Sequence, residues 1–100
     1  MDGPKSDIVI TRHDEGARGE YRATVAGSDM IGRLTYQRRG NTLVADQTLV
    51  PPAIGGKGVA AKLVEALDAD ARQSGDTIVP QCSYIEAAFR RHPEWAELRA

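Results

Sequence analysis

The segment 55–58, Gly-Gly-Lys-Gly, carries the clearest signal for chemistry in the chain. Glycines leave backbone N–H groups uncovered, and N–H groups at the start of a helix attract anions because the helix dipole is positive there. Lys57 adds a positive charge within reach of a phosphate oxygen. The segment therefore predicts a cradle for a diphosphate that is bound without a metal ion. A tight turn whose glycines only permit close packing is the alternative.

Two other phosphate-binding patterns fit this segment less well. The Walker A loop needs Ser or Thr after its lysine to hold magnesium, and Gly58 stands there instead. Residues 56–61 match the dinucleotide-binding pattern with a final alanine, but that pattern belongs to repeated parallel strand–helix–strand units. The chain has room for one such unit. Its acidic residue is also missing, because Asp76 precedes the next strand rather than ending it.

Cys82, the one cysteine of the chain, is the second candidate for chemistry. It comes directly before a predicted helix start, where the helix dipole favours a thiolate. A reactive thiol is one interpretation, and a small buried apolar side chain is the other. His13 and His92 have no spacing typical of a zinc site, so we expect no metal.

Composition bounds the classes of protein to which the chain can belong. With 100 residues, 41% of them hydrophobic, it predicts one globular domain over 1–100. The net charge of −1 argues against a nucleic-acid partner, and no apolar run reaches the ~20 residues that span a bilayer. The start, MDGPKSD, lacks the apolar core of a signal peptide. A single cysteine fits a reducing compartment, so we expect a cytoplasmic protein with no membrane partner.

The first half of the chain shows the alternation of apolar and polar residues that is typical of half-buried strands. Gly-Ser and Gly-Asn dipeptides between the alternating segments are two-residue hairpin signals. Four strands joined by short turns predict an antiparallel meander. Asp46 and Thr48 lie two residues apart, so we expect both on one face. Asp46 either faces a substrate there or, as we expect, is a solvated strand carboxylate. The strands are predicted over 8–12, 20–27, 30–38 and 42–50.

The second half of the chain begins with helical spacing. Apolar residues recur at this spacing from Val59 to Ala71, and Gly75 supplies the stop. Segment 77–82 is a short apolar strand, which we expect to run parallel to the fourth strand after a right-handed crossover.

A second helix is predicted from a capping box, with Ser83 as N-cap and Glu86 three residues later. It runs to about Arg91, because Pro93 prevents much continuation. The predicted fold class is α+β, with a mixed, mainly antiparallel sheet in the order β-β-β-β-α-β-α.

Three spaced motifs, read together, resemble one family. The strand that leads into Gly56-Lys57-Gly58-Val59-Ala60 and its helix looks like the acetyl-coenzyme A motif of the GNAT acetyltransferase superfamily. More closely, the chain resembles very small GNAT-like N-acetyltransferases over roughly residues 8–95. The matching segments are Thr48-Leu49-Val50-Pro51, Pro80-Gln81-Cys82-Ser83-Tyr84 and His92-Pro93-Glu94-Trp95, together with a hairpin similar to IGRLTYQRRGNTLV.

This resemblance implies a minimal GNAT-like fold that binds acetyl-CoA (coenzyme A). Backbone groups near Val50 would pair with the pantetheine amides, and Ile54 and Val59 would line the pantetheine arm. The N–H groups from Gly55 to Ala60 would hold the pyrophosphate. The cofactor-binding residues expected from the resemblance are Val50, Ile54, Gly55, Gly56, Lys57, Gly58, Val59 and Ala60.

In such a site two residues are candidates for catalysis. Cys82 would contact the thioester or accept the acyl group transiently, and Tyr84 would donate a proton to the departing sulfur. A packing aromatic with a tethered hydroxyl is the alternative for Tyr84. The chain departs from the family pattern in three places. Gly55 stands where Arg or Gln is usual, Gln47 where the small family often has histidine, and Phe89 where many larger enzymes place an acid tyrosine.

The expected function is therefore transfer of an acetyl group from acetyl-CoA to an unidentified amine. The alternative is a non-catalytic module that binds CoA or an acyl-CoA as a sensor or adaptor. A β-sheet interaction module without a ligand follows if the glycines serve only chain geometry.

Overall fold

The protein is described by a computed structural model that covers residues 7–56 and 58–100. The strands and helices follow the predicted order β-β-β-β-α-β-α, and the described residues add two 3-10 turns. The elements are β1 (Ile8–Asp14), β2 (Arg18–Val25), β3 (Ile31–Arg39), β4 (Thr42–Leu49), η2 (Pro52–Ile54), α1 (Val59–Ser74), β5 (Thr77–Pro80), α2 (Ser83–Arg91) and η3 (Pro93–Leu98). Within the described part of the chain, no helix is long and apolar enough to cross a membrane.

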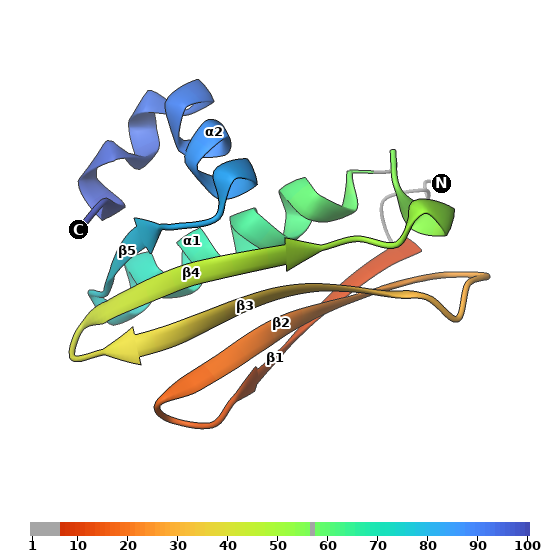
Figure 1. Cartoon of the computed structure of the whole chain (residues 1–100), viewed down its shortest axis with the longest axis horizontal. Helices are drawn as coiled ribbons and strands as arrows, with labels where there is room; N and C mark the ends of the chain where they lie inside the picture. The colour runs from red at the N-terminus through yellow and green to blue at the C-terminus, as the bar shows by residue number, and fades with distance from the viewer. Residues whose placement is uncertain (1–6, 57) are drawn as a thin grey trace.

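The five strands form one sheet in the order β1-β2-β3-β4-β5. The first four strands pair antiparallel, and β5 pairs parallel to β4 after the crossover through α1. The predicted meander and parallel return are both confirmed. Figure 1 shows the helices gathered over one side of this sheet, and no element among residues 7–56 and 58–100 covers the other side.

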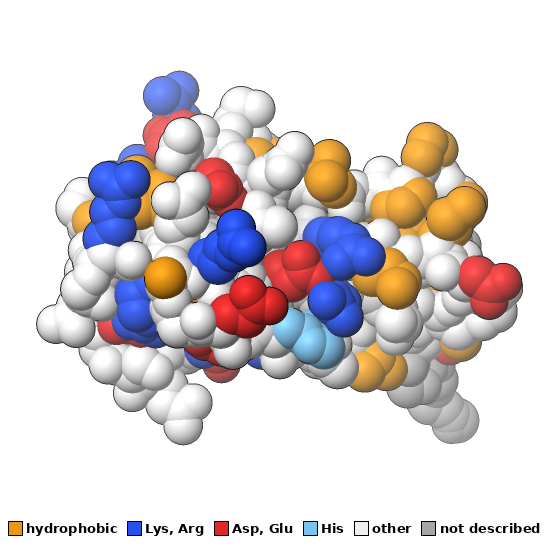
Figure 2. All heavy atoms as spheres, turned by 60° about the horizontal axis from the view of Figure 1, so that its bottom comes forward, with side chains coloured by type: hydrophobic (Ala, Val, Ile, Leu, Met, Phe, Trp, Pro, Cys, Tyr) orange, Lys and Arg blue, Asp and Glu red, His pale blue; other side chains and the backbone are white. Residues whose placement is uncertain are grey.

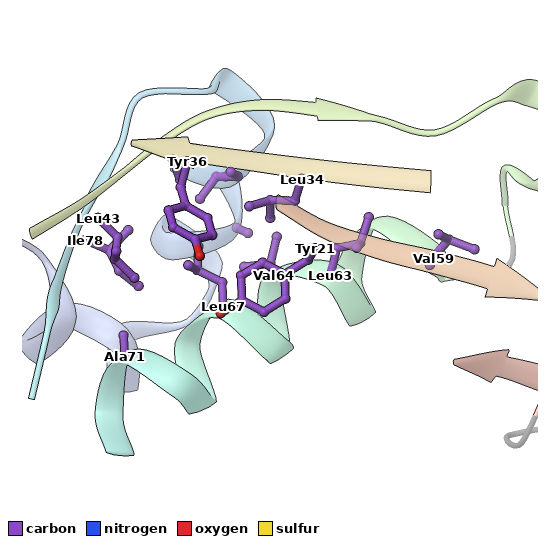
Figure 3. Packing of buried hydrophobic residues seen from close by; sticks show 14 of the residues in the cluster. Tyr21, Leu34, Tyr36, Leu43, Val59, Leu63, Val64, Leu67, Ala71 and Ile78 are labelled. Atoms are coloured by element: carbon purple, nitrogen blue, oxygen red, sulfur yellow. The ribbon is translucent and has the colours of Figure 1, made fainter. Parts of the chain in front are cut away.

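The core lies between the sheet and α1, because one face of each strand and one stripe of the helix are apolar. Tyr21, Leu34, Tyr36 and Leu43 are almost fully buried on the strand side. Figure 3 shows them opposite the apolar stripe of α1. That stripe consists of Val59, Leu63, Val64, Leu67 and Ala71.

Glycines bound helix α1 at both ends. Gly58 and Gly75 both adopt the left-handed conformation, with φ of 81° and 76°, which residues with a Cβ rarely reach. Gly75 donates its N–H to the carbonyl of Ala71 and ends the helix as predicted. Gly58 begins it without a side-chain cap from any described residue.

A β-bulge interrupts the pairing of β3 with β4. The register shifts between Thr35, which faces Gln47, and Tyr36, which faces Ala45. Asp46 is therefore the extra residue, and the alternation along β4 is broken at this point. The prediction that Asp46 and Thr48 share a face is wrong for this reason. Asp46 bonds Thr35 on the uncovered face, whereas Thr48 bonds Cys82.

Helix α2 begins one residue earlier than its sequence signal suggests. Cys82 is the N-cap, Ser83 is already helical, and no side-chain cap bond forms. The predicted capping box is therefore wrong. Glu86 instead bonds Arg90 and Arg99, because guanidinium partners are within reach of its carboxylate.

Candidate functional site

The glycine segment forms an exposed loop at the start of α1. Gly56 and Gly58 have φ of 75° and 81°, and a Cβ built on either would meet no described atom within 4 Å. Open space therefore lies in front of both residues. The conformation favours glycine and leaves the backbone accessible. Lys57, which the sequence analysis assigned to the same cradle, lies outside the described residues.

The first turn of α1 presents N–H groups to this open space. Among bonds between described residues, the N–H of Lys62 is the first in α1 to bond back along the chain, to the carbonyl of Gly58 at 3.0 Å. The N–H groups of Val59, Ala60 and Ala61 precede it, and such groups have no partner within a helix. The loop and helix start thus fit an anion, on backbone geometry and dipole direction alone.

The remaining predicted cofactor-binding residues are Val50, Ile54, Gly55 and Val59, which flank the loop in the sequence. Ile54 and Val59 are 0% and 1% exposed, so their side chains belong to the core. Gly55 donates its N–H to the carbonyl of Pro52 at 3.1 Å, so in this conformation that N–H is not free for a phosphate oxygen. Val50 packs half-buried at the edge of the core, directly after β4. Direct contact of these four residues with a coenzyme stays a prediction.

Strands β4 and β5 separate halfway along β4. Their last paired residues are Ala45 and Pro80, and the Ala45 carbonyl then accepts the N–H groups of Gln81 and Cys82, each at 3.0 Å. Beyond this fork β5 turns into α2 while β4 continues to Leu49 (Figure 1). In the described structure, the β5-facing side of β4 has no strand partner after Ala45.

Cys82 lies at this fork and contacts β4 across it. Its thiol donates a hydrogen bond to the Thr48 hydroxyl, with Sγ and Oγ1 3.5 Å apart. Burial alone raises the pKa of the half-buried thiol, but hydrogen bonds from Thr48 and from the N–H groups of Ile85 and Tyr84 to the thiolate outweigh it. The pKa of Cys82 is therefore lowered, as expected for a thiol at a helix N-terminus.

Of the two aromatic residues in α2, Tyr84 lies near Cys82 and Phe89 lies in the core. Tyr84 lies in the first turn of α2, two residues from Cys82, and packs half-buried against the core. Phe89 is 4% exposed and contacts Trp95 edge to face, with ring centroids 5.5 Å apart. Its place in the core leaves no hydroxyl there for proton transfer. His92 ends α2 and stacks on Trp95, away from the fork.

A hollow on the uncovered face was not predicted from the sequence. Its volume is about 590 Å³. Figure 2 shows this side of the molecule, where acidic and basic side chains lie together with a histidine. The alternation of charged residues in β2 and β3 was the available signal, but it does not reveal which of them surround a depression. The lining residues are His13, Glu15, Ala17, Arg18, Gly19, Glu20, Arg22, Thr35, Tyr36, Gln37 and Asp46.

Comparison with known proteins agrees with this architecture. The sequence pattern of the GCN5-related N-acetyltransferases matches residues 20–98. The crystal structure of nourseothricin acetyltransferase superposes with a TM-score of 0.58 at 18% identity, over 85% of this chain and 67% of that one, which is a likeness of fold. No curated protein sequence matches. Because the family pattern spans most of the chain, including β4, the glycine loop, α1 and α2, the protein belongs to the GCN5-related N-acetyltransferase family.

Proposed function

We propose that this protein binds acetyl-CoA at the glycine loop and transfers the acetyl group to an amine. The observation that carries the proposal is the uncapped first turn of α1 behind two glycines with positive φ and open space in front of them. The N–H groups from Gly56 to Ala60, with Lys57, would hold the diphosphate. A negative charge there is further stabilised by the positive end of the 16-residue helix.

The fork supplies the second part of the proposed site. Beyond Ala45, the unpaired edge of β4 offers backbone N–H and carbonyl groups up to Val50. An extended amide-containing arm would add to this edge like a further strand. It would run from the α1 N-terminus toward Cys82 and Thr48, which lie where the two strands part.

The chain's own residues then serve the transfer step. When bound, acetyl-CoA supplies the acetyl group as a thioester. The N–H groups of Tyr84 and Ile85, at the start of α2, hydrogen-bond Cys82 at the fork and would stabilise negative charge there. Tyr84 would give a proton to the departing sulfur, and Cys82, with its lowered pKa, would contact the acyl carbon or accept it transiently.

Calorimetry with CoA, acetyl-CoA and pantetheine tests the binding step. We expect the first two to bind and pantetheine, which lacks the diphosphate, to bind much more weakly. At one hundred times Kd, CoA should raise the free energy of unfolding by about 2.7 kcal/mol. Absence of CoA binding by the folded protein at millimolar concentration would overturn the proposal.

Gly58→Asp tests the proposed diphosphate site most directly, because it puts a negatively charged side chain where the diphosphate would bind. Gly40→Asp is the matched control, since Gly40 also has a positive φ and open space, in the β3–β4 turn at the other end of the sheet. We expect CoA binding to be lost in the first variant and kept in the second.

A non-catalytic CoA-binding sensor or adaptor is the second candidate. The buried Phe89, which has no proton to give, favours it, as does Gln47 in place of a histidine. Release of free thiol from acetyl-CoA with a panel of amines distinguishes the two. A sensor binds the coenzyme without releasing thiol, and an enzyme releases thiol in proportion to the amine that is added.

A further inference from the structure

Strand β1 forms one edge of the sheet, and within residues 7–56 and 58–100 no strand pairs with its outer side. The opposite edge, β5, is different, because Arg99 bridges Ile78 there and Ala100 donates its N–H to the Ile78 carbonyl at 2.8 Å. Edge strands usually carry a lysine, a proline or a bulge that prevents further pairing. The seven residues of β1 include no Lys or Pro, and their register with β2 has no shift. β1 is therefore open to a further strand.

The outward-pointing backbone groups of β1 belong to alternate residues. At one end of the strand, the Asp7 carbonyl accepts the N–H of Ala26 at 2.8 Å. At the other end, Glu15 donates its N–H to the Arg18 carbonyl, also at 2.8 Å. Both bonds continue the β1–β2 register, in which bonded pairs alternate with unbonded ones. The backbone groups that point away from β2 are therefore those of Ile8, Ile10, Arg12 and Asp14.

An apolar groove accompanies these groups along the edge. Ile8 and Ile10 pack against the core, but each is only partly buried. Helix α1 passes the edge with two small residues, Ala66 and Ala69, and the edge groove of about 180 Å³ lies between them and Ile10. A space of this size can hold an aliphatic side chain. The positive charge of Arg12, on the same face, is already neutralised by acidic residues of its own chain. Free hydrogen-bonding groups beside an apolar groove are what an added strand requires.

The sequence of β1 complements a second copy of itself in one antiparallel register. A bonded pair must join two residues whose backbone groups point outward, which a two-fold axis at Ile10 achieves. Ile10 then faces Ile10 of the second copy, and Ile8 faces Arg12. Residues that pair directly point to the same face of a sheet, so the second Ile10 lies over the edge groove. An axis at Thr11 would instead set Asp14 against the apolar Ile8 and bring the two Arg12 side chains together on a diagonal.

Charges and side-chain shapes also fit the register centred on Ile10. At both ends of the pairing, His13 comes beside Asp7 of the second copy, and both residues are exposed. Opposite charges across neighbouring strands are stabilising. Val9, which is 53% exposed, faces Thr11 of the second copy, and β-branched pairs of this kind pack well between strands. No two like charges face each other directly in this register.

We propose that a second copy of this chain pairs with β1 across a two-fold axis at Ile10 and joins the two five-stranded sheets into one continuous sheet. Each bonded pair exchanges both of its backbone hydrogen bonds. A single pair of strands makes a small interface, so the dimer is a weak one. The fork lies at β4, on the other side of the sheet from β1 (Figure 1), and stays accessible in both copies. This inference does not depend on the proposed function.

Sedimentation equilibrium of the full chain between about 10 µM and about 1 mM, a range that suits a weak interface, tests the assembly. We expect a monomer–dimer equilibrium. Amide hydrogen exchange, followed by NMR at both ends of this range, tests the register. The N–H groups of Ile8, Ile10 and Arg12 should exchange about threefold or more slowly in the concentrated sample. Those of Val9, Thr11 and His13, which bond β2, should exchange equally slowly in both samples.

Ile10→Lys puts two ammonium groups face to face at the two-fold axis, and it should leave the protein monomeric at about 1 mM. Val79→Lys is the matched control, because Val79 is an exposed apolar residue in β5, at the other edge of the sheet. It should dimerise like the wild type. A wild-type chain that stays monomeric at about 1 mM, or a dimer in which the Ile10 N–H exchanges as fast as in the monomer, would overturn the inference.

Asp7→Lys provides a second test if Ile10→Lys does not fold, because Asp7 is exposed. Loss of its attraction to His13 should weaken the dimer about two- to fivefold, the usual effect of an exposed ion pair. Adding His13→Glu restores opposite charges at the same two positions, so the double variant should regain the wild-type affinity. A double variant that dimerises no better than Asp7→Lys would overturn the register centred on Ile10.

Discussion

Asp68 is the residue whose environment conflicts most with its chemistry. It is 4% exposed on the buried side of α1, and neither carboxylate oxygen has a hydrogen-bond partner within the described part of the chain. Desolvation raises its pKa to about 7, against a weaker opposing effect of Arg72 and His92. The carboxyl group therefore stays protonated in the folded protein across a pH range in which it is ionised in the unfolded chain.

This difference predicts a stability that falls with rising pH. Between the unfolded pKa of 3.8 and about 7, the folded state holds a proton that the unfolded state releases, so each pH unit costs the fold free energy. The full effect is about 4 kcal/mol above pH 7. Asp68→Asn removes the titration. We expect its advantage over the wild type to grow from near zero at pH 4 to this value at pH 8, in urea unfolding experiments.

Asp29→Asn is the control for this prediction, since Asp29 is exposed in the turn between β2 and β3 and does not act on the pKa of Asp68. Its stability should follow the wild-type curve at every pH. If the Asp68→Asn and wild-type curves ran parallel, Asp68 would titrate equally in both states, and a buried, unpartnered carboxyl would be excluded.

Because the pKa of Cys82 is lowered, we expect its thiol to react faster at neutral pH than an ordinary cysteine does. Removal of the Thr48 hydroxyl takes away one donor to the thiolate, so Thr48→Val should raise the thiol pKa and slow alkylation by iodoacetamide at pH 7 about three- to tenfold. Thr35→Val, which removes a hydroxyl on the opposite face, should leave the rate unchanged. An unaltered rate in Thr48→Val would show that the helix start alone sets the thiol's reactivity.

At the scale of elements, the depth of α1 depends on a glycine in β3. A Cβ on Gly32 would lie 2.9 Å from Val59 Cγ1 and 3.6 Å from Leu63 Cδ1. Val59 is short, β-branched and buried, so it cannot rotate away from an added methyl group. The first turn of α1, and with it the proposed cradle, comes this close to the sheet because Gly32 has no side chain.

Gly32→Ala should therefore push the start of α1 outward and weaken CoA binding by about fivefold or more, the scale of mild overpacking. Val59→Ala in the same chain provides room for the new methyl group and should restore most of the affinity. Gly19→Ala is the control, because a Cβ there meets Tyr36 and the His13 carbonyl, far from α1's first residue. It should lower stability with little effect on CoA affinity. Calorimetry measures the CoA affinity of each variant, and thermal unfolding measures its stability. If the double variant bound CoA no more tightly than Gly32→Ala alone, the explanation would be wrong.

Elements whose signals are local could be predicted from the sequence. Alternation predicted β2 and β3, runs of β-branched or apolar residues predicted β1 and β5, and Gly75 predicted the end of α1 within one residue. The bulge at Asp46 could not be predicted, because it depends on how β4 aligns with β3 and leaves no mark in β4 itself. The capping box at Ser83 failed for a similar reason, since Arg99, from the end of the chain, competes for Glu86.

In the candidate site, too, only the features with local sequence signals could be predicted. Backbone features of the glycine loop follow from local residue types, and the left-handed conformations of Gly56 and Gly58 are those that its pattern requires. The contact of Cys82 with Thr48 and the hollow around Asp46 arise from segments that only the fold brings together. Side-chain convergence of this kind has no counterpart in a single sequence.

At the scale of the whole molecule, Arg12 connects the edge strand β1 to helix α1. Arg12 of β1 lies 5.4 Å and 5.3 Å from the ring centroids of Tyr21 and Tyr36. It also donates hydrogen bonds to Asp70 of α1 and to Asp14. Tyr21 and Tyr36 complete the network by donating to these same carboxylates, at 2.8 Å each. Four elements meet at this cluster, which lies far along α1 from the glycine loop.

Loss of Arg12 should therefore weaken the whole fold rather than the site. In Arg12→Leu the two carboxylates lose their cation, and the stacking on both tyrosine rings is lost as well. Because the side chain is 26% exposed, solvent screens part of the effect, and we expect a loss of about 2 kcal/mol in urea unfolding. Arg18→Leu, which breaks an exposed pair with Glu15 at 3.9 Å, should cost less than about 0.5 kcal/mol. CoA affinity of folded Arg12→Leu should equal that of the wild type, because the N-terminus of α1 is fixed by the packing of Val59 in the core against Gly32. A loss of CoA affinity in parallel with the loss of stability would mean that the two ends of α1 move together.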